Sequence, residues 1–417
     1  MASRLQQVSG HLAPTDGVAN KIGVKSPEDV VIVSALRSAI TRARKGGFAE
    51  TLPDEILAGV FKALIKQTGI DPSIVNDIAV GGVLPPGGGA TGSRFVMAAL
   101  YAGFPESSSV STCNRQCSSG LQAVVQIATA IQTGLIEVGI GAGVESMTKN
   151  YGAASLSVSS DKIADSCAAA ADCLIPMGIT SENVAAEFNI SRAKQDAFAA
   201  SSHAKAVAAQ KNGWFKDEIV PLEATVVDKE GNESTVIVDR DDGVRPGTTP
   251  ETLAKLKPAF NENGTTTAGN ASQVSDGAAA VLLMKRKTAE KLGLPIVGKY
   301  ITSAVVGVPP RVMGVGPAYA IPVAVERAGL KISDVDIYEI NEAFASQAVY
   351  SVEKLQIPFE KVNPKGGAIA FGHPLGCTGA RQIATLLPEL KRQGKKIGVT
   401  SMCIGSGMGM AAVFESE

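Results

Sequence analysis

The second half of this 417-residue chain repeats the pattern of its first half. Three pairs of segments correspond: Cys377-Thr378-Gly379-Ala380 with Cys117-Ser118-Ser119-Gly120, residues 333–337 with residues 75–78, and residues 296–306 with residues 30–35. Internal self-similarity indicates a duplicated architecture, although unrelated βα units also share such patterns. The repeat therefore predicts two α/β halves whose sheets form one core, with functional sites on loops at their junction.

Strand-like and helix-like runs alternate along the chain, which predicts a mostly buried, largely parallel sheet with helices on its faces. Strands are expected at residues 30–35, 78–84, 138–144, 278–284, 296–306, 399–402 and 411–414, and helices at residues 53–65, 121–135, 191–212 and 383–390. The character changes between residues 147 and 274, which is typical of an inserted domain. The predicted division is a flexible N-terminal segment (1–28), an N-terminal domain (29–146 and 275–295), the inserted domain (147–274) and a C-terminal domain (296–417).

Composition excludes several classes of function. A net charge of −1 offers no basic excess to hold nucleic acid or an anionic membrane. Apolar runs are far shorter than the roughly 20 residues that a membrane-spanning helix needs, so no span is expected. Six cysteines in a chain of this length do not form a disulfide scaffold, which favours reduced thiols in an intracellular compartment.

Cys117 is the first candidate for chemistry. It lies between a strand-like run at residues 108–113 and a helix-like run that begins with Leu121. Unpaired N–H groups and the positive end of the helix dipole at such a position favour the thiolate, which is the reactive form of cysteine. A small buried residue at the start of a core helix is the alternative for an isolated cysteine.

Three further stretches combine turn-forming glycines with reactive side chains: Asn341-Glu342-Ala343-Phe344, residues 363–379, and Cys403-Ile404-Gly405-Ser406-Gly407. His373, one of three histidines, lies in the second stretch and is the natural general base for a nucleophilic cysteine. A zinc site is the competing interpretation, because Cys113 and Cys117 are four residues apart, as are His373 and Cys377. The spacing and the small neighbouring residues favour a reactive loop over a metal site.

These stretches resemble the signatures of the thiolase family, and the resemblance extends from about residue 29 to residue 414. It is most specific in residues 363–379, which match the glycine-histidine-proline motif of that family. The resemblance implies a thiolase fold: duplicated α/β/α halves that form a five-layered α-β-α-β-α core with an inserted loop domain. It also implies a homodimer.

The resemblance further implies a role for each residue of the site. Cys117 would be the acylated nucleophile, His373 the base that keeps it a thiolate, and Cys403 the acid/base at the α-carbon of acetyl-CoA. Asn341 would hold a water that stabilises the enolate oxygen together with His373. The backbone N–H groups of Cys117 and Gly405 would form a second oxyanion hole.

Coenzyme A is implied as a co-substrate, with no permanently bound cofactor and no metal. The inserted domain would hold it through Ser272, on the pantetheine arm, and Arg245, which would stack on the adenine. A solvated loop charge is the alternative for Arg245. Met177 resembles a position in the acyl pocket. Pro176 before it favours the degradative branch, since acetoacetyl-specific relatives often carry histidine there.

The implied reaction is thiolytic cleavage of a 3-ketoacyl-CoA by CoA, the last step of fatty-acid β-oxidation. A biosynthetic acetoacetyl-CoA thiolase is the nearest alternative. Ketoacyl synthases share the fold but typically lack a second catalytic cysteine such as Cys403. A thiolase-like lipid carrier need not retain Cys117, His373 and Cys403 together.

The N-terminus carries Arg4-Leu5, five further residues, and then His11-Leu12. This pattern resembles an N-terminal peroxisomal import signal, which implies an import receptor as partner and a peroxisomal location; a frayed tail on a cytoplasmic protein is the alternative. Cys113 also departs from the family, where an aliphatic residue is common. It is expected to fill the core, and the alternative is an inhibitory disulfide with Cys117 under oxidation.

Overall fold

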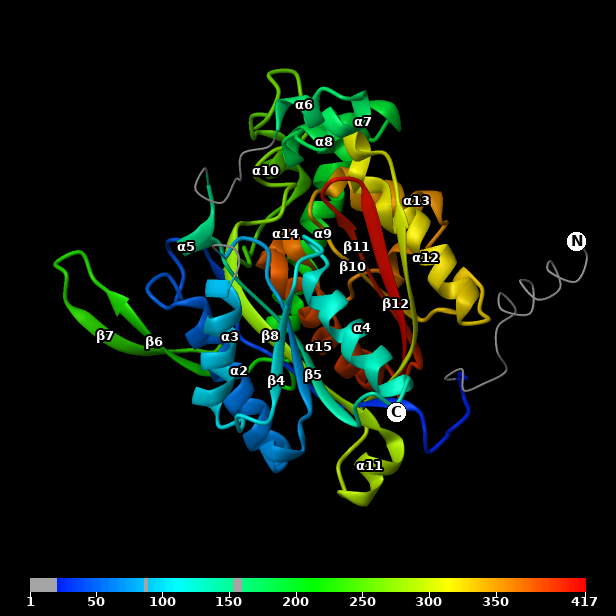
Figure 1. The fold of residues 1–417 in the computed structure, drawn as a ribbon. Coiled ribbons are helices and arrows are strands. Elements are labelled where there is room, and N and C mark those ends of the chain that lie inside the picture. The colour runs from blue at the N-terminus through cyan, green and yellow to red at the C-terminus, as the bar shows by residue number, and fades with distance from the viewer. Residues whose placement is uncertain (1–20, 86–88, 153–159) are drawn as a thin grey trace, which may run out of the picture.

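Two sheets with the same strand order form the centre of the computed structural model, which describes residues 21–85, 89–152 and 160–417 (Figure 1). The first sheet has the order β4 (Ser109–Cys113), β3 (Asp77–Gly81), β5 (Val138–Ser146), β8 (Ser275–Lys285), β1 (Val30–Arg37). The second has the order β10 (Ile337–Ile340), β11 (Ile397–Ile404), β12 (Met408–Ser416), β9 (Gly298–Gly307). A parallel bridge from Tyr338 to Val362 takes the place of β4 in the second sheet. The predicted duplication is thereby confirmed.

The two sheets meet where β1 pairs with β9, at Val31 with Lys299 and Ile32 with Gly298. The expectation of a largely parallel sheet is wrong. Parallel pairing joins β3 to β4 and β5, and β10 to β11, whereas β8, β1, β12 and β9 pair with antiparallel neighbours. A buried strand is apolar in either arrangement, so sequence pattern does not separate the two.

Helices pack in three layers around these sheets, as Figure 1 shows. The outer pair α2 (Pro53–Thr68) and α3 (Gly89–Ala102) covers the first sheet, and α12 (Gly316–Arg327) and α13 (Ala345–Lys354) cover the second. The central pair α4 (Ser119–Gln132) and α15 (Leu375–Gln393) lies between the sheets. Along β8, Ala278, Ala280 and Leu282 face the outer helices and Ala279, Val281 and Leu283 face the central pair. Apolar side chains on both faces explain the continuous apolar strands in the sequence.

The predicted helices and strands correspond to elements of the structure, with errors at two ends. The strand expected at residues 78–84 ends at Gly81, and the helix expected at residues 121–135 also ends early. The prediction ends that helix at Leu135, but α4 ends at Gln132 and Leu135 is 80% exposed. Gly134 has a positive φ of 75°, and such a residue commonly follows the last turn of a helix. The repeated segments before β3 and β10 each contain a 3₁₀ turn, at Pro72–Ile74 and Ile332–Asp334.

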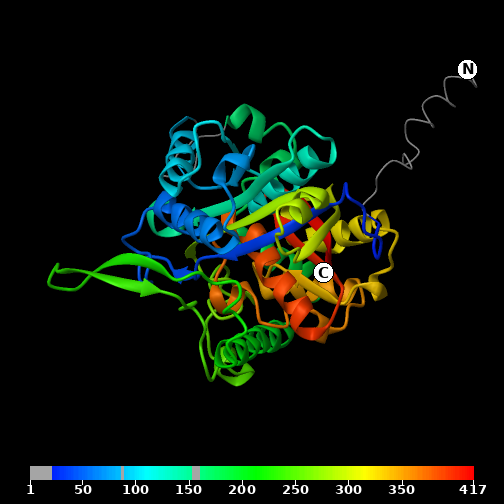
Figure 2. The same cartoon turned by 90° about the horizontal axis from the view of Figure 1, so that it is seen from below.

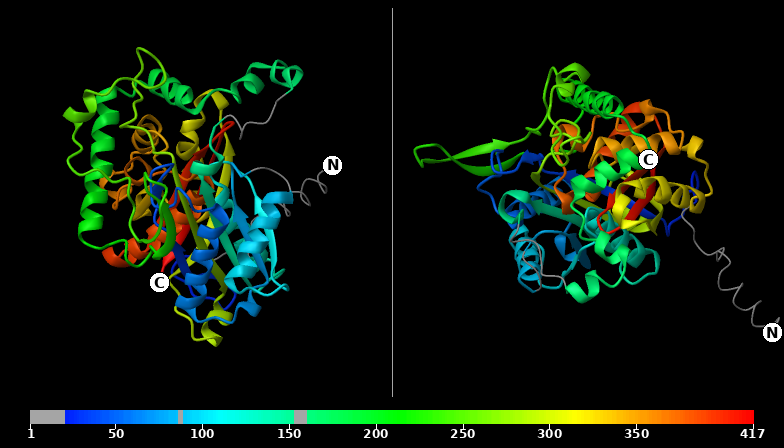
Figure 3. Two further views of the ribbon diagram at one scale, coloured as in Figure 1. Left: turned by 90° about the vertical axis from the view of Figure 1, so that its left-hand side faces the viewer. Right: turned by 90° about the horizontal axis from the view of Figure 1, so that it is seen from above.

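The inserted segment leaves the first sheet after β5 and returns at β8. Its elements are α5 (Met147–Asn150), α6 (Asp161–Ala164), α7 (Ala168–Asp172), α8 (Met177–Glu187), α9 (Arg192–Lys211), β6 (Leu222–Val227), β7 (Glu233–Val238) and α10 (Pro250–Ala254). Helix α9 runs along the C-terminal half (Figure 3), and the β6–β7 hairpin projects away from the body (Figure 2). The short elements β2 (Thr41–Arg42), α11 (Arg286–Lys291) and α14 (Ala368–Phe371) complete the described chain. None of the described helices is both long enough and apolar enough to cross a bilayer.

The central helices α4 and α15 touch each other through glycines. A Cβ atom on Gly379 would lie 2.1 Å from the backbone nitrogen of Leu121, and one on Gly120 would lie 2.6 Å from the carbonyl oxygen of Gly376. These distances are too short for any side chain, so the helices approach in backbone contact. The contact places the beginnings of both helices, and the loops before them, side by side.

Replacing Gly379 with alanine tests this contact. The methyl group must displace the α4 backbone, so we expect Gly379→Ala to lower the free energy of unfolding by about 3 kcal/mol. Gly307→Ala is the control, because nothing lies within 4 Å of a Cβ at that position. Equal denaturant midpoints for the two variants would contradict the packing argument.

Candidate active site

Cys117 lies on a strained turn between β4 and α4. Gln116 before it has a positive φ of 47°, which costs free energy in a residue other than glycine and is common at functional sites. Its backbone N–H donates to the Asn114 side-chain oxygen at 2.8 Å, which stabilises the turn. Cys117 is 9% exposed and lies just before Ser118, the N-cap residue of α4. The predicted position at a helix start is correct.

A second strained turn, between β11 and β12, faces the first. Ser406 and Gly407 have positive φ angles of 62° and 91°, and Ser406 Oγ accepts a hydrogen bond from Gln116 Nε2 at 2.7 Å. A Cβ atom on Gly405 would lie 2.1 Å from Gln116 Oε1, so a side chain there would displace the Gln116 amide from this position. The backbone N–H groups of Gly405 and Cys117 both act on the Cys117 thiol and lower its pKa. The predicted pair of N–H donors therefore converges on one point.

Burial controls the ionisation of Cys117. It raises the pKa of the thiol to about 11, and the charge of Glu145 acts in the same direction, against the two N–H donors. The expectation that the helix start favours a thiolate is therefore wrong, because the cost of desolvating the charge outweighs the effect of the backbone donors. At neutral pH Cys117 is therefore a protonated thiol.

His373 is held in the orientation of a base. It lies between α14 and α15 and is 4% exposed. Thr378 Oγ1 donates to the Pro374 carbonyl at 3.1 Å, so it accepts from His373 Nδ1 at 2.7 Å. The unprotonated nitrogen is then Nε2, which accepts from Asn341 Nδ2 at 3.2 Å. Burial and Arg381 lower the pKa of His373 to about 3, so the imidazole is neutral and able to take a proton.

Asn341 and Cys403 lie at the ends of the adjacent strands β10 and β11. Asn341 is buried, and its side-chain oxygen has no hydrogen-bond partner, which indicates a place for a water or a substrate atom. Cys403 is fully buried in contact with Met313 and Ala343. Burial raises the pKa of its thiol well above its usual value, and the nearby Cys117 adds to this shift. The structure thus groups Cys117 with Gly405 and Cys403, and His373 with Asn341. The contact between Gly120 and Gly376 brings the loops of Cys117 and His373 together.

The three positions expected to bind CoA lie on separate parts of the inserted segment. The backbone N–H of Ser272 donates to Ala343 at 2.9 Å, beside the Asn341 loop. Met177 begins α8 and is 37% exposed. Arg245 is exposed, and its backbone N–H donates to His203 Nδ1 at 3.2 Å. No hydrogen bond or ion pair among the described residues joins Arg245 to Cys117, His373 or Cys403.

The remaining cysteines show no metal-site geometry. Within residues 21–85, 89–152 and 160–417, no three His, Cys, Asp or Glu side chains form a group that could hold a metal ion. The Cys113 thiol donates to the Ser119 carbonyl at 3.4 Å, and Cys377 is fully buried within α15.

The suspected import signal at Arg4, Leu5, His11 and Leu12 lies outside the described residues.

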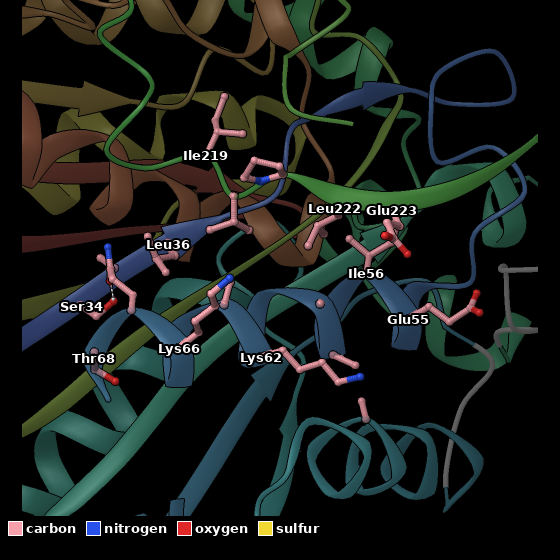
Figure 4. Close-up of a pocket in the computed structure, with 18 of the residues that line it drawn as sticks. Ser34, Leu36, Glu55, Ile56, Lys62, Lys66, Thr68, Ile219, Leu222 and Glu223 are labelled. Atoms are coloured by element: carbon pink, nitrogen blue, oxygen red, sulfur yellow. Dashed lines mark hydrogen bonds between the residues drawn. The ribbon is translucent and has the colours of Figure 1, made fainter. Parts of the chain in front are cut away.

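A groove of about 1820 Å³ lies elsewhere, between α2, the base of the β6–β7 hairpin and the end of α15 (Figure 4). Lys62, Lys66 and Leu222 are among the residues that line it. Neither Cys117, His373 nor Cys403 does. Size alone therefore does not mark the catalytic centre of this protein.

Comparison with known proteins agrees with the site. The family model for the thiolase N-terminal domain matches residues 30–287, and that for the thiolase C-terminal domain matches residues 294–416. The chain is 56% identical to the peroxisomal 3-ketoacyl-CoA thiolase B of Rattus norvegicus, over 99% of each protein. The chain belongs to the thiolase family.

Two solved thiolase structures from Saccharomyces cerevisiae extend the comparison. The dimeric peroxisomal thiolase is 51% identical, with 95% of this chain and 99% of that chain covered and a TM-score of 0.87. Another structure of a peroxisomal 3-ketoacyl-CoA thiolase has a TM-score of 0.77 at 45% identity, with 95% and 100% covered. It is described as a five-layered α-β-α-β-α structure constructed from two core domains of identical topology. The predicted thiolase fold is confirmed.

Two residues of this thiolase site had no role in the sequence-based prediction. Thr378 fixes the tautomer of His373, and Gln116 joins the two strained turns. A hydroxyl one helical turn after Pro374 is a detectable signal for Thr378, since a serine or threonine there can bond to the carbonyl four residues earlier. The Gln116 contact crosses 290 residues of sequence and leaves no local signal.

Thr378→Val removes the hydroxyl with little change of shape. His373 then loses the acceptor at Nδ1 and can adopt the wrong tautomer, so we expect kcat to fall about 100-fold. Thr378→Ser, which keeps the hydroxyl, should stay within about 5-fold of wild type. Both variants are measured by steady-state turnover with an acyl-CoA substrate, and equal kcat values for valine and serine would contradict the orienting role.

Proposed function

We propose that this protein cleaves 3-ketoacyl-CoA with CoA to give acetyl-CoA and an acyl-CoA shortened by two carbons, the last step of fatty-acid β-oxidation. The observation that carries the proposal is the backbone contact of Gly120 with Gly376, which brings the Cys117 and His373 loops side by side. Cys403 lies near Cys117, and His373 is held by Asn341. The 56% identity to a peroxisomal 3-ketoacyl-CoA thiolase, over 99% of each protein, supports the same activity and a peroxisomal location. A dimeric neighbour of the same fold supports an acyltransferase that works as a homodimer.

In the first half-reaction Cys117 gives its proton to His373 Nε2, and its sulfur attacks the 3-keto carbon. The bond between C2 and C3 then breaks, and its electrons form the enolate of acetyl-CoA. Cys403 donates a proton to that carbon. This leaves acyl-Cys117, a protonated His373 and a Cys403 thiolate. A thiol suits this proton step, because the α-carbon of a thioester is a far weaker acid than a carboxylic acid.

In the second half-reaction a CoA thiol gives its proton to the Cys403 thiolate and attacks the acyl-Cys117 carbonyl. The Cys117 thiolate leaves and takes back the proton from His373, which restores the starting state. Two half-reactions through one acyl-enzyme require ping-pong kinetics. The neutral resting states of Cys117 and His373 suit this cycle, because each proton moves only when a bond forms or breaks.

Fixed donors stabilise the two oxyanions of the cycle. The N–H groups of Cys117 and Gly405 serve the tetrahedral oxygen formed when the Cys117 thioester is made or cleaved. At the second position, a water held by Asn341 and His373 serves the enolate oxygen. The unpartnered Asn341 oxygen supports a water there, since that oxygen needs one donor.

Serine variants of the two cysteines test the division of labour. Cys117→Ser should reduce thiolysis by at least about 1000-fold, because the acylated group is lost. Cys403→Ser should still form the acyl-enzyme, seen by mass spectrometry, while exchange of the acetyl-CoA α-protons with deuterium stops. Turnover is followed by loss of the enolate absorbance of acetoacetyl-CoA with CoA. Wild-type activity in Cys117→Ser would reject the mechanism.

Substrate length separates the degradative reaction from the biosynthetic alternative. A long-chain 3-ketoacyl-CoA should be cleaved with a kcat/KM at least equal to that for acetoacetyl-CoA. Activity restricted to acetoacetyl-CoA would favour the alternative instead. The absence of a histidine before Met177 supports the degradative branch, because Pro176 stands there.

The inserted segment at residues 147–274 is proposed as the CoA-binding domain, with residues 29–146 and 275–295 and residues 296–417 as the two core domains. Ser272 supports this, since it lies beside the Asn341 loop and can meet the pantetheine arm near the reacting atoms. Arg245 is exposed and can stack on the adenine. Met177 is proposed to contact the acyl chain from the start of α8. No permanently bound cofactor is proposed.

Arg245→Ala tests the adenine contact. We expect KM for CoA to rise about 10-fold with kcat nearly unchanged, because stacking on a remote group contributes equally to ground and transition states. Lys229→Ala, at the exposed turn of the β6–β7 hairpin, is a matched loss of surface charge and should leave KM unchanged. An unaltered KM for Arg245→Ala would favour the solvated loop charge.

The free edge of the first sheet is a proposed part of the dimer interface. Strand β4 is an edge strand, and α3 beside it exposes Met97, Leu100 and Tyr101. An exposed edge next to an apolar helix face is typical of a surface that pairs with a second copy.

The import receptor is proposed to bind the signal at Arg4, Leu5, His11 and Leu12.

A further inference from the structure

A buried carboxylate lies where the two catalytic helices meet. Glu145, on β5, is fully buried. Its Oε2 accepts from the backbone N–H groups of Gly376 at 3.0 Å and Val83 at 3.1 Å, and its Oε1 accepts from that of Leu84 at 3.2 Å. Gly376 lies in the first turn of α15, three residues after His373, so the carboxylate also lies at the positive end of that helix.

The other two donors belong to the loop after β3, which adjoins the nucleophile turn. The Val83 carbonyl accepts from Asn114 Nδ2 at 3.3 Å, and Asn114 in turn holds the backbone of Gln116. One carboxylate therefore connects the segment that carries His373 to the segment that carries Cys117.

Glycines bring the backbones together around Glu145. A Cβ on Gly143 would lie 2.1 Å from the Gly376 carbonyl oxygen, and one on Gly81 would lie 2.3 Å from the backbone of Ser119. A side chain at either position would push α15 or α4 away from the first sheet. Because no side chain separates these backbones, the hydrogen bond from the Gly376 N–H to Glu145 holds the first turn of α15 in place.

We propose that Glu145 is a positioning residue for the thiolase reaction: its carboxylate fixes the first turn of α15, and with it His373, relative to the Cys117 turn. The inference rests on the proposed function for its effect on turnover. The same carboxylate places a negative charge close to Cys117, which opposes formation of the thiolate before substrate binds.

The surroundings of Glu145 differ from those of the buried acid Glu218. Glu218 is compensated by Arg37 and Lys365, and its pKa is lowered. Glu145 has backbone donors, and burial raises its pKa to about 7, with a further contribution from Asp276 on β8. Removing its charge is therefore expected to change the local electrostatics without breaking an ion pair.

The ionisable groups around Cys117 determine the pH at which its thiol titrates. They are Glu145 on β5, Cys403 on β11, His373 before α15, and Cys113 and Arg115 on the β4 side. The pKa of His373 is lowered to about 3, and burial raises the pKa of Cys403 well above its usual value. Burial raises the pKa of Cys113 to about 11, so Cys113 titrates in the same range as Cys117. Glu145 is the acid that already carries its negative charge before this range is reached.

Glu145→Gln is tested by the pH dependence of Cys117 alkylation with iodoacetamide, read from the Cys117 peptide by mass spectrometry. Loss of a negative charge stabilises the thiolate, so the midpoint should move to lower pH by about 1 unit. Turnover should fall about 10-fold or more in kcat, with KM for CoA within about 2-fold. Glu182→Gln is the matched control, since Glu182 also accepts backbone N–H groups, from Thr265 and Thr266, and its midpoint should equal that of wild type.

An unchanged midpoint in Glu145→Gln would overturn the electrostatic role, and an unchanged kcat would overturn the positioning role. If that variant does not fold, Glu145→Asp keeps the charge on a shorter side chain. The kcat of this variant should fall, while its alkylation midpoint stays within about 0.3 pH units of wild type. A wild-type kcat would overturn the proposal. Alkylation needs no substrate, so a wild-type protein without thiolysis activity would reject the proposed function and leave the midpoint test valid.

Discussion

The backbone contact between α4 and α15 is the constraint on which the rest of the site depends. Both helices begin beside Gly120 and Gly376, where no side chain fits between them. The loops before the helices carry Cys117 and His373, so the relative position of these two residues, the proposed nucleophile and base, is set by close packing in the centre of the core. Catalytic groups held this way need little reorganisation during reaction. The duplication of the fold supplies the two equivalent helices that make such a contact.

Buried ion pairs lock the inserted segment onto this core. Arg37 on β1 donates to Glu218 at 2.7 Å and to Asp241 at 2.7 and 2.9 Å, and Glu218 also pairs with Lys365. Thr385 of α15 donates to the same Glu218 at 2.9 Å. Charges buried in this way add little net stability, but breaking one leaves an uncompensated charge and is strongly unfavourable. The network therefore fixes the position of the inserted segment relative to α15 and to the glycine-rich segment before His373.

Much of this arrangement could be predicted from the sequence because its determinants are local. Apolar runs marked β1, β5 and β8, and glycine-rich motifs marked the loops of Cys117, His373 and Gly405. The pKa of Cys117 could not be predicted, because it depends on burial by strands and helices distant in sequence. The prediction of mostly parallel strands failed for a related reason. Both faces of β8 and β12 are covered, so these strands lack the alternation of polar and apolar residues that marks a half-exposed antiparallel sheet.

The two halves differ where the chemistry requires it. Between β11 and β12 the second half has a tight turn that carries Gly405, whereas the first half has the whole inserted segment between β5 and β8. Helix α15 begins at Leu375, before Cys377, and this cysteine is enclosed in the core with its pKa raised to about 12. Helix α4 begins only at Ser119, so Cys117 stays on the turn and meets the N–H groups of Gly405 and its own backbone. A shift of the helix start by a few residues is thus enough to leave one cysteine on a turn and to enclose the other within a helix of the core.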